Sequence, residues 1–289
     1  MAAARNWLGY ALLVTAAWGV WGAFTGVPSE HGFPDTLTYV VWAGTMIPPA
    51  AWALHQVGWR LQHDRRSIGL GLAIGVLGAG GQLLLFRAVT LGPTYLIFPI
   101  VSLSPAVTIV LSFLLLRERT GRLGVAGIVL AVLSLPLFDY SPETGAPLGT
   151  WFFLALGIMA AWGLQAYFIK LANASMDAQS IFAYMALTAL LLAPVAWALT
   201  DFSHPVNLGW SGPYLAAAIQ MLNAVGALLL VYAFRHGKAI VVSPLVNAGA
   251  PLLTTAISLG LAGALPGPYK LAAAVFALLG AVLLSLQPE

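Results

Sequence analysis

The chain has 289 residues, of which 60% are hydrophobic and only 7% are charged, and it contains no cysteine. A typical soluble domain is about 25% charged and roughly 45–50% apolar, and a soluble fold of this length could not bury so much apolar surface. The composition therefore predicts an integral membrane protein, and it excludes disulfides and thiolate metal sites. Because the basic residues behind the net charge of +3 are spread along the chain, we attribute them to membrane topology rather than nucleic-acid binding.

Apolar segments long enough to span a bilayer, which takes about 20 residues, recur ten times along the chain. We expect transmembrane helices at 7–27, 36–57, 68–89, 94–116, 121–138, 149–172, 178–199, 210–234, 239–262 and 268–286. Prolines, glycines and charges separate these segments. No connection is long enough for a separate soluble domain, so the predicted fold class is an all-α membrane protein of ten helices.

The distribution of lysine and arginine predicts the orientation, because cytoplasmic loops carry an excess of these residues. With the N-terminus in the cytoplasm, ten of the 12 basic residues lie inside, and only Arg87 and Lys270 lie outside. This split favours an N-in, C-in topology and an even number of helices.

Similar motifs recur in the same order in the two parts of the chain. Ala-Ala-Trp-Gly stands at 16–19 and again at 160–163, and Leu-Phe-Arg at 85–87 has a counterpart in Ala-Phe-Arg at 233–235. Each arginine precedes a segment with two prolines, which are Pro99 and Pro105 in the first part and Pro244 and Pro251 in the second. We therefore predict two five-helix repeats, 1–140 and 141–289. An odd number of helices in each gives them opposite orientations, as in many secondary transporters.

These motifs resemble those of the drug/metabolite transporter superfamily, and specifically its ten-helix EamA-type members. The resemblance extends to Leu-Phe-Arg-Ala-Val-Thr-Leu-Gly-Pro-Thr at 85–94 and to Leu-Leu-Leu-Arg-Glu-Arg-Thr at 114–120. It implies a central cavity lined by the first, third, fourth, sixth, eighth and ninth helices, and export of amino acids, other metabolites or drugs. One departure is visible, because the second repeat has Gly-Ala-Leu-Pro at 263–266 where the first has Arg117-Glu118-Arg119.

Polar and aromatic side chains within the predicted spans are the candidates for substrate binding, because polar groups in lipid usually face a cavity or another helix. The predicted substrate-binding residues are Trp18, Trp21, Gln82, Tyr95, Phe98, Trp162, Gln165, Gln220, Asn223 and Asn247. Two alternatives stay open for individual residues. Amides also hold helices together in membranes, and tryptophans also form belts at the membrane surface.

Four prolines are predicted to act in gating: Pro99, Pro105, Pro244 and Pro251. A proline inside a helix leaves the carbonyl one turn earlier without its partner, and such a carbonyl can bind substrate or simply accompany a kink. Small residues beside these prolines would allow hinging.

The chain carries no acidic residue in the middle of a predicted span, although proton-coupled transport usually needs a titratable group in the pathway. We therefore expect facilitated diffusion or exchange of a small polar or zwitterionic metabolite, amino-acid-like and exported. The alternatives are a nucleoside, nucleobase or sugar transporter, and a membrane scaffold that transports nothing.

No enzyme motif is present, and neither a metal nor a cofactor is expected. The expected partners are a small-molecule substrate and membrane lipids. We expect a monomer or homodimer in a bacterial-type inner (plasma) membrane.

Overall fold

The computed structural model describes residues 6–91, 97, 100–101, 103–139, 149–263 and 267–286, and every regular element in them is a helix. The first part of the chain forms α1 (Asn6–Phe24), α2 (Val27–Glu30), α3 (Asp35–Thr45), α4 (Ile47–Gln56), α5 (Arg65–Leu91), α7 (Ser104–Leu114) and α8 (Arg122–Asp139). The second part forms α9 (Thr150–Ala172), α10 (Ala178–Ala198), the π-helical turn η2 (Trp210–Tyr214), α11 (Leu215–His236), α12 (Ala239–Ala262) and α13 (Pro268–Ser285).

Each of the ten predicted segments contains helix among its described residues, but the segment 36–57 differs from expectation. It forms two helices, α3 and α4, which meet at Met46. Pro48 and Pro49 lie in the first turn of the second helix, and they have no N–H to continue the hydrogen bonding of the first. The hydroxyl of Thr45 also donates to the carbonyl of Trp42 at 2.7 Å, within the last turn of α3.

Six helical segments in the described part of the chain are long and apolar enough to cross a membrane on their own. They are Asn6–Glu30, Arg65–Leu85, Thr150–Ala172, Ala178–Ala198, Trp210–His236 and Ala239–Leu261. Large apolar side chains on the outside of the bundle stay exposed, including Phe153 at 70% and Leu191 at 62%. A surface of this kind suits a lipid environment.

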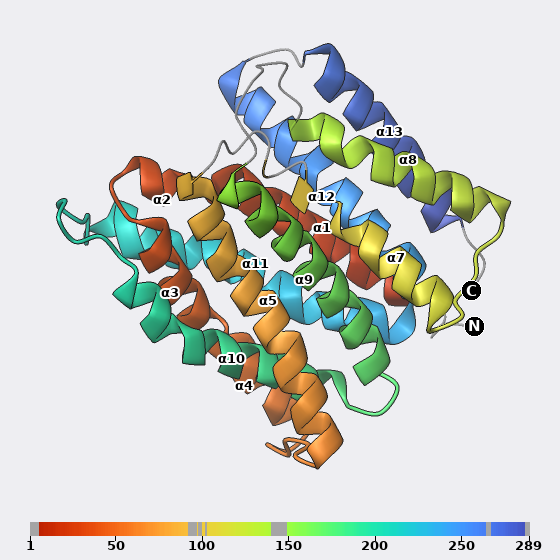
Figure 1. Ribbon diagram of the computed structural model, residues 1–289, viewed down its shortest axis with the longest axis horizontal. Helices are drawn as coiled ribbons and strands as arrows, with labels where there is room; N and C mark the ends of the chain where they lie inside the picture. Colours follow the sequence, from red (N-terminus) through yellow and green to blue (C-terminus); the bar gives the residue numbers. More distant parts are fainter. Residues whose placement is uncertain are drawn as a thin grey trace.

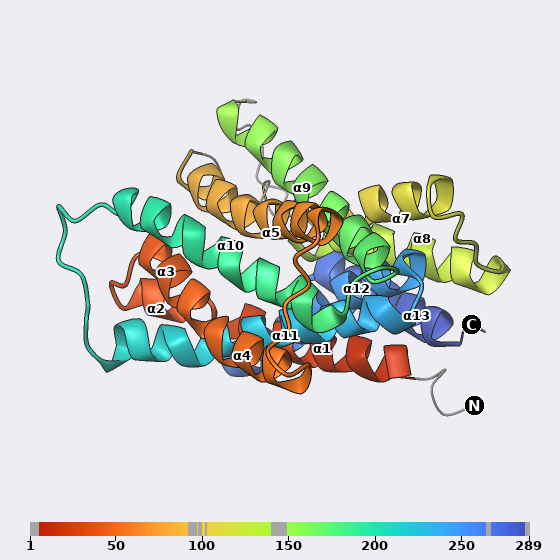
Figure 2. The same ribbon diagram turned by 90° about the horizontal axis from the view of Figure 1, so that it is seen from below.

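Small residues let the helices pack closely (Figures 1 and 2). Helix α8 runs along α13, α5 along α9, and α1 packs against both α11 and α12. A Cβ built on Gly280 of α13 would meet the backbone oxygen of Gly127 on α8 at 3.0 Å, so the two backbones touch at this crossing. Such contacts provide the close packing that membrane helices use in place of a hydrophobic driving force.

Helix α1 begins and α13 ends at the same end of the bundle, as both views show. The end of α11 lies there too, because a Cβ on Gly237 would meet Cβ of Trp7 at 3.0 Å. We call this end of the bundle the N/C end.

Candidate functional site

A hydrogen-bonded chain of side chains links α1 to α11 in the interior of the bundle. The indole Nε1 of Trp21 donates to Oε1 of Gln220 at 3.0 Å, and Nε2 of Gln220 donates to the hydroxyl of Thr25 at 3.2 Å. Gln220 is buried, with 4% of its surface exposed. Both ends of this amide are therefore satisfied within the protein, and Trp21 and Gln220 hold two helices together.

Asn223 lies three residues after Gln220 on α11 and contacts two further tryptophans. Its side-chain oxygen accepts from Nε1 of Trp42 on α3 at 3.3 Å, and its backbone carbonyl accepts from Nε1 of Trp18 on α1 at 3.3 Å. Three helices thus meet at one residue. Trp42 was not among the predicted binding residues, although its position in a predicted span made it a candidate by the same criterion.

A second group lies between α5 and α9 and has fewer internal hydrogen bonds. Nε1 of Trp162 donates to the carbonyl of Gly78 at 3.3 Å, and the side-chain amide of Gln165 lies directly against Gly78. Gln82 is four residues beyond Gly78, hence on the same face of α5. The amides of Gln82 and Gln165 are both half-buried, and neither has a hydrogen-bond partner in the part of the chain that the structure describes.

The tryptophans of the two Ala-Ala-Trp-Gly motifs make equivalent contacts. Trp18 lies where a Cβ on Gly226 would be, and Trp162 lies where a Cβ on Gly81 would be. Each ring therefore fills a notch that a glycine opens in the neighbouring helix, and each indole donates to the carbonyl three residues before that glycine.

The glycines of the same motifs also make equivalent contacts, each with a different neighbouring helix from the tryptophan. The carbonyl of Gly19 accepts from Thr254 of α12 at 2.9 Å, and the carbonyl of Gly163 accepts from Thr108 of α7 at 3.0 Å. Each motif thus fixes one helix between two neighbours.

The predicted gating prolines lie in α7 and α12 as far as they are described. Pro105 is buried in the first turn of α7, Pro244 is buried in α12, and Pro251 is half-buried further along α12. Pro251 cannot donate to the carbonyl of Asn247, which lies one turn earlier. The side chain of Asn247 donates to the carbonyl of Ser243 at 2.9 Å.

Three predicted residues, Tyr95, Phe98 and Pro99, lie outside the described residues. Where the chain is described, no group of three or more His, Asp and Glu side chains is placed to hold a metal ion.

A hollow of about 320 Å³ opens between α1, α12 and α13 and has an almost wholly apolar lining. Among the residues that line this hollow, Thr15 alone has a hydroxyl group, and none of the predicted binding residues is among them. Because this hollow offers almost no polar group to a ligand, the amide and indole groups are the better candidate for a site.

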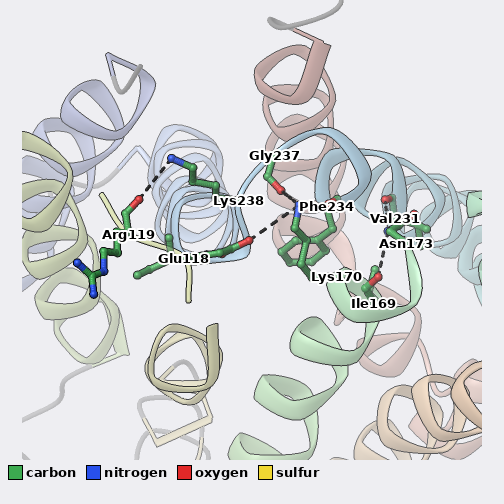
Figure 3. Close-up of polar contacts among 10 residues, drawn as sticks. Glu118, Arg119, Ile169, Lys170, Asn173, Val231, Phe234, Gly237 and Lys238 are labelled. Carbon is green, nitrogen blue, oxygen red and sulfur yellow. Dashed lines mark hydrogen bonds and ion pairs between the residues drawn. The ribbon is translucent and has the colours of Figure 1, made fainter. Parts of the chain in front are cut away.

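A polar cluster that the sequence did not predict lies at the N/C end, where α9, α11 and α12 converge (Figure 3). The ammonium of Lys170 donates to the carbonyls of Phe234 and Gly237 and lies 3.9 Å from the carboxylate of Glu118. The other oxygen of Glu118 accepts from the backbone N–H of Ile240 at 3.0 Å. The side chain of Lys170 thus turns inward to the end of α11.

Asn173 extends this cluster one turn further along the chain. Its Nδ2 donates to the carbonyls of Ile169 and Val231 at 3.0 and 3.1 Å (Figure 3). The end of α9 is therefore attached to the last two turns of α11 by both Lys170 and Asn173.

An all-helical bundle with membrane-length apolar helices, crossed through glycine notches and carrying amides and indoles inside, is the architecture of a multi-pass membrane protein. The model of the EamA-like transporter family matches residues 5–138 and again residues 149–286. The chain belongs to the EamA-like transporter family, and it is a membrane transporter of the drug/metabolite transporter type.

The fold also matches a solved structure, described as "Crystal structure of protein". The TM-score is 0.77 at 17% sequence identity, over 96% of this chain and 98% of the other. This likeness establishes the fold alone. No curated protein matches the chain in sequence.

Proposed function

We propose that the protein moves a small polar or zwitterionic metabolite, amino-acid-like in chemistry, through a central site between α5 and α9. The observation that carries this proposal is the contrast between two sets of amides. Gln220 is buried and hydrogen-bonded at both ends, whereas Gln82 and Gln165 are half-buried and without partners among the described residues.

An unpartnered amide in the interior of a membrane protein suits a polar substrate. Each amide offers an acceptor oxygen and a donor NH₂, so two of them on facing helices match a ligand that has both kinds of group. An α-amino acid has both, in its carboxylate and its ammonium. The ring of Trp162, one turn before Gln165, would contact the apolar part of the same molecule.

Two inverted five-helix repeats, 1–140 and 141–289, are proposed as the frame for alternating access. The equivalent contacts of Trp18 with Gly226 and of Trp162 with Gly81 support a common ancestry of the two halves. An N-in, C-in topology is supported by the basic residues and by the position of the start of α1 and the end of α13 at one end of the bundle.

Facilitated diffusion or exchange is the mechanism we favour, with Pro105, Pro244, Pro251 and the undescribed Pro99 in gating. The sequence places no acidic residue in the middle of a span, so a proton carrier is missing from the middle of the pathway. We further propose export, a bacterial-type inner membrane and a monomeric or homodimeric state.

A thermal-shift screen of the purified protein against a metabolite panel of amino acids, nucleosides, nucleobases and sugars tests this proposal. A ligand that binds the folded state stabilises it in proportion to occupancy. We expect amino acids with apolar or aromatic side chains to raise the melting temperature, and Gln82→Ala and Gln165→Ala to abolish the shift. Gln56→Ala, at an exposed position at the end of α4, is the matched control.

Other outcomes of the same screen separate the alternatives. A shift with nucleosides or sugars that depends on Gln82 and Gln165 would keep the site and replace the substrate class. The proposal would be contradicted if no compound of the panel shifted the melting temperature and none was transported in flux measurements with proteoliposomes. That result would favour a membrane scaffold.

A further inference from the structure

The polar cluster at the N/C end joins segments that are far apart in the sequence. Glu118 lies between α7 and α8, Lys170 lies near the end of α9, and Ile240 lies in the first turn of α12. The Glu118 and Lys170 side chains are 10% and 23% exposed. One largely buried carboxylate therefore bridges the first half of the chain to two helices of the second.

The charges in this cluster match the helix ends that they touch. A helix carries a partial negative charge at its C-terminal end and a partial positive charge at its N-terminal end. The ammonium of Lys170 binds the carbonyls of Phe234 and Gly237 at the end of α11, and the carboxylate of Glu118 binds the N–H of Ile240 at the start of α12. The short connection between α11 and α12 is thus held from both sides.

A weaker contact reinforces the same junction. The ammonium of Lys238, the residue that precedes α12, donates to the backbone carbonyl of Arg119 at 3.3 Å (Figure 3). The segment after α7 is therefore attached to the start of α12 through two consecutive residues. Any motion that separates the halves at this end must break the contacts of Glu118 with Lys170 and Ile240, and that of Lys238 with Arg119.

We propose that Glu118, Lys170, Phe234, Gly237 and Ile240 form a latch that keeps the pathway closed at the N/C end. This inference rests on the proposed transport function, because it assigns a closed state to a pathway between the halves. When the protein opens toward the N/C end, Glu118 leaves Ile240 and Lys170, and α12 separates from the segment after α7. The latch selects which end is open, and it does not itself bind substrate.

Thiol accessibility tests the latch directly, because the natural chain has no cysteine. Ser243 is 2% exposed and lies on α12 three residues after Ile240, so a Ser243→Cys thiol reacts only when this end opens. The rate of reaction with a membrane-impermeant maleimide, added from the N/C side of proteoliposomes, is the measurement. In this background we expect Glu118→Gln and Lys170→Met each to raise the rate about tenfold, within the usual range of coupling between conformational states.

Two controls separate latch opening from general loosening. Arg119→Gln keeps the backbone carbonyl that Lys238 uses, so it should leave the rate unchanged. A Thr188→Cys thiol on α10, where Thr188 is 3% exposed, should stay unreactive in all variants. Equal labelling of Thr188→Cys and Ser243→Cys would contradict the latch, as would an unchanged rate in folded Glu118→Gln and Lys170→Met proteins.

A milder variant keeps the test decisive if those two proteins do not fold. Glu118→Asp retains the charge but shortens the side chain by one methylene, and it should give a smaller rise in the same rate. An unchanged rate in that variant would also contradict the latch. Because labelling needs no substrate, the two proposals can fail separately. A raised labelling rate in a protein that binds no metabolite would support the latch and reject the proposed substrate. An unchanged labelling rate in a protein that binds amino acids would reject the latch and support the proposed substrate.

Discussion

Trp21 on α1 and Gln220 on α11 are joined by a 3.0 Å hydrogen bond from the indole Nε1 to the side-chain oxygen. Their positions are 199 residues apart, so the contact ties the first helix of one half to a helix of the other. Gln220 is buried, and its second polar group is bound by Thr25. The pair therefore joins the two helices, whereas the half-buried amides of Gln82 and Gln165 have no hydrogen-bond partner among the described residues.

Replacing Trp21 with phenylalanine should lower the free energy of unfolding by about 1 kcal/mol, because the ring is kept but the oxygen of Gln220 loses its donor. Reversible unfolding in detergent, followed by circular dichroism, measures the difference. Trp197→Phe on α10 is the control, because Trp197 is 55% exposed and should tolerate the change. Equal effects of the two substitutions would show that the indole hydrogen bond contributes nothing.

The glycine notches provide a second prediction: substitution by alanine should destabilise the protein at some glycines and stabilise it at another. A Cβ at Gly226 or Gly81 would lie closer than 3.0 Å to the indole of Trp18 or Trp162, and such overpacking costs about 1–3 kcal/mol. Gly226→Ala and Gly81→Ala should each destabilise the protein by amounts in this range. Gly157→Ala on α9, where nothing lies within 4 Å, should instead stabilise it by about 0.5–1 kcal/mol. A loss of stability at Gly157 equal to that at Gly81 would refute the notch explanation.

The helix positions were predictable because a long apolar segment in lipid must satisfy its own backbone hydrogen bonds, and it does so as a helix. The segments 149–172 and 239–262 became α9 and α12 with nearly the same bounds. The prediction of a single span at 36–57 made no use of Pro48-Pro49, which lies where α3 gives way to α4. Only the backbone geometry decides whether a proline pair bends a span or starts a new helix.

The polar and aromatic residues of the candidate site could be picked out from the sequence, but their contacts could not. Gln220 and Asn223 were both predicted as binding residues, and both contact tryptophans from other helices. The sequence could not tell a tryptophan in a helix crossing from one in a cavity, because the same side chain serves both. The paired glycines at 81 and 226 were the signal for the first alternative, and only tertiary contacts reveal that pairing.

The contact between Glu118 and Lys170 could not be derived from the sequence at all. Charges at helix ends usually face solvent or lipid headgroups, and nothing in the spacing of these two residues indicates a partner. Their meeting depends on the way the segment after α7 returns to the start of α12, which is a property of the whole bundle.

The start of α5 provides a prediction on pH dependence outside the membrane-spanning part. The side chain and backbone of Ser67 donate to Asp64, which lowers the pKa of that carboxyl below its usual value. A carboxyl with a lowered folded-state pKa stabilises the fold above its unfolded-state pKa of about 3.9, and that contribution is lost as the pH falls through the lowered value. Asp64→Ala should therefore be less stable than the natural protein at pH 6, and the gap should narrow below roughly pH 4.

Melting temperatures measured from pH 6 down to pH 3 check this prediction. Ser67→Ala removes one of the donors and should show a smaller version of the same narrowing. A gap between Asp64→Ala and the natural protein that stayed constant over the whole range would mean that the hydrogen bonds from Ser67 do not depend on the charge of Asp64.

Pro244 tests whether the backbone of α12 acts in gating. Alanine at this position restores an N–H that can bind the carbonyl of Ile240, which straightens and stiffens the helix beside Glu118. Pro244→Ala should keep or raise the stability and slow substrate flux in proteoliposomes by about tenfold, because opening at the N/C end then costs more. Pro194→Ala is the matched control, since Pro194 also lies inside a helix, but in α10 rather than α12. If both variants transported at the natural rate while remaining folded, Pro244 would be a packing feature without a role in gating.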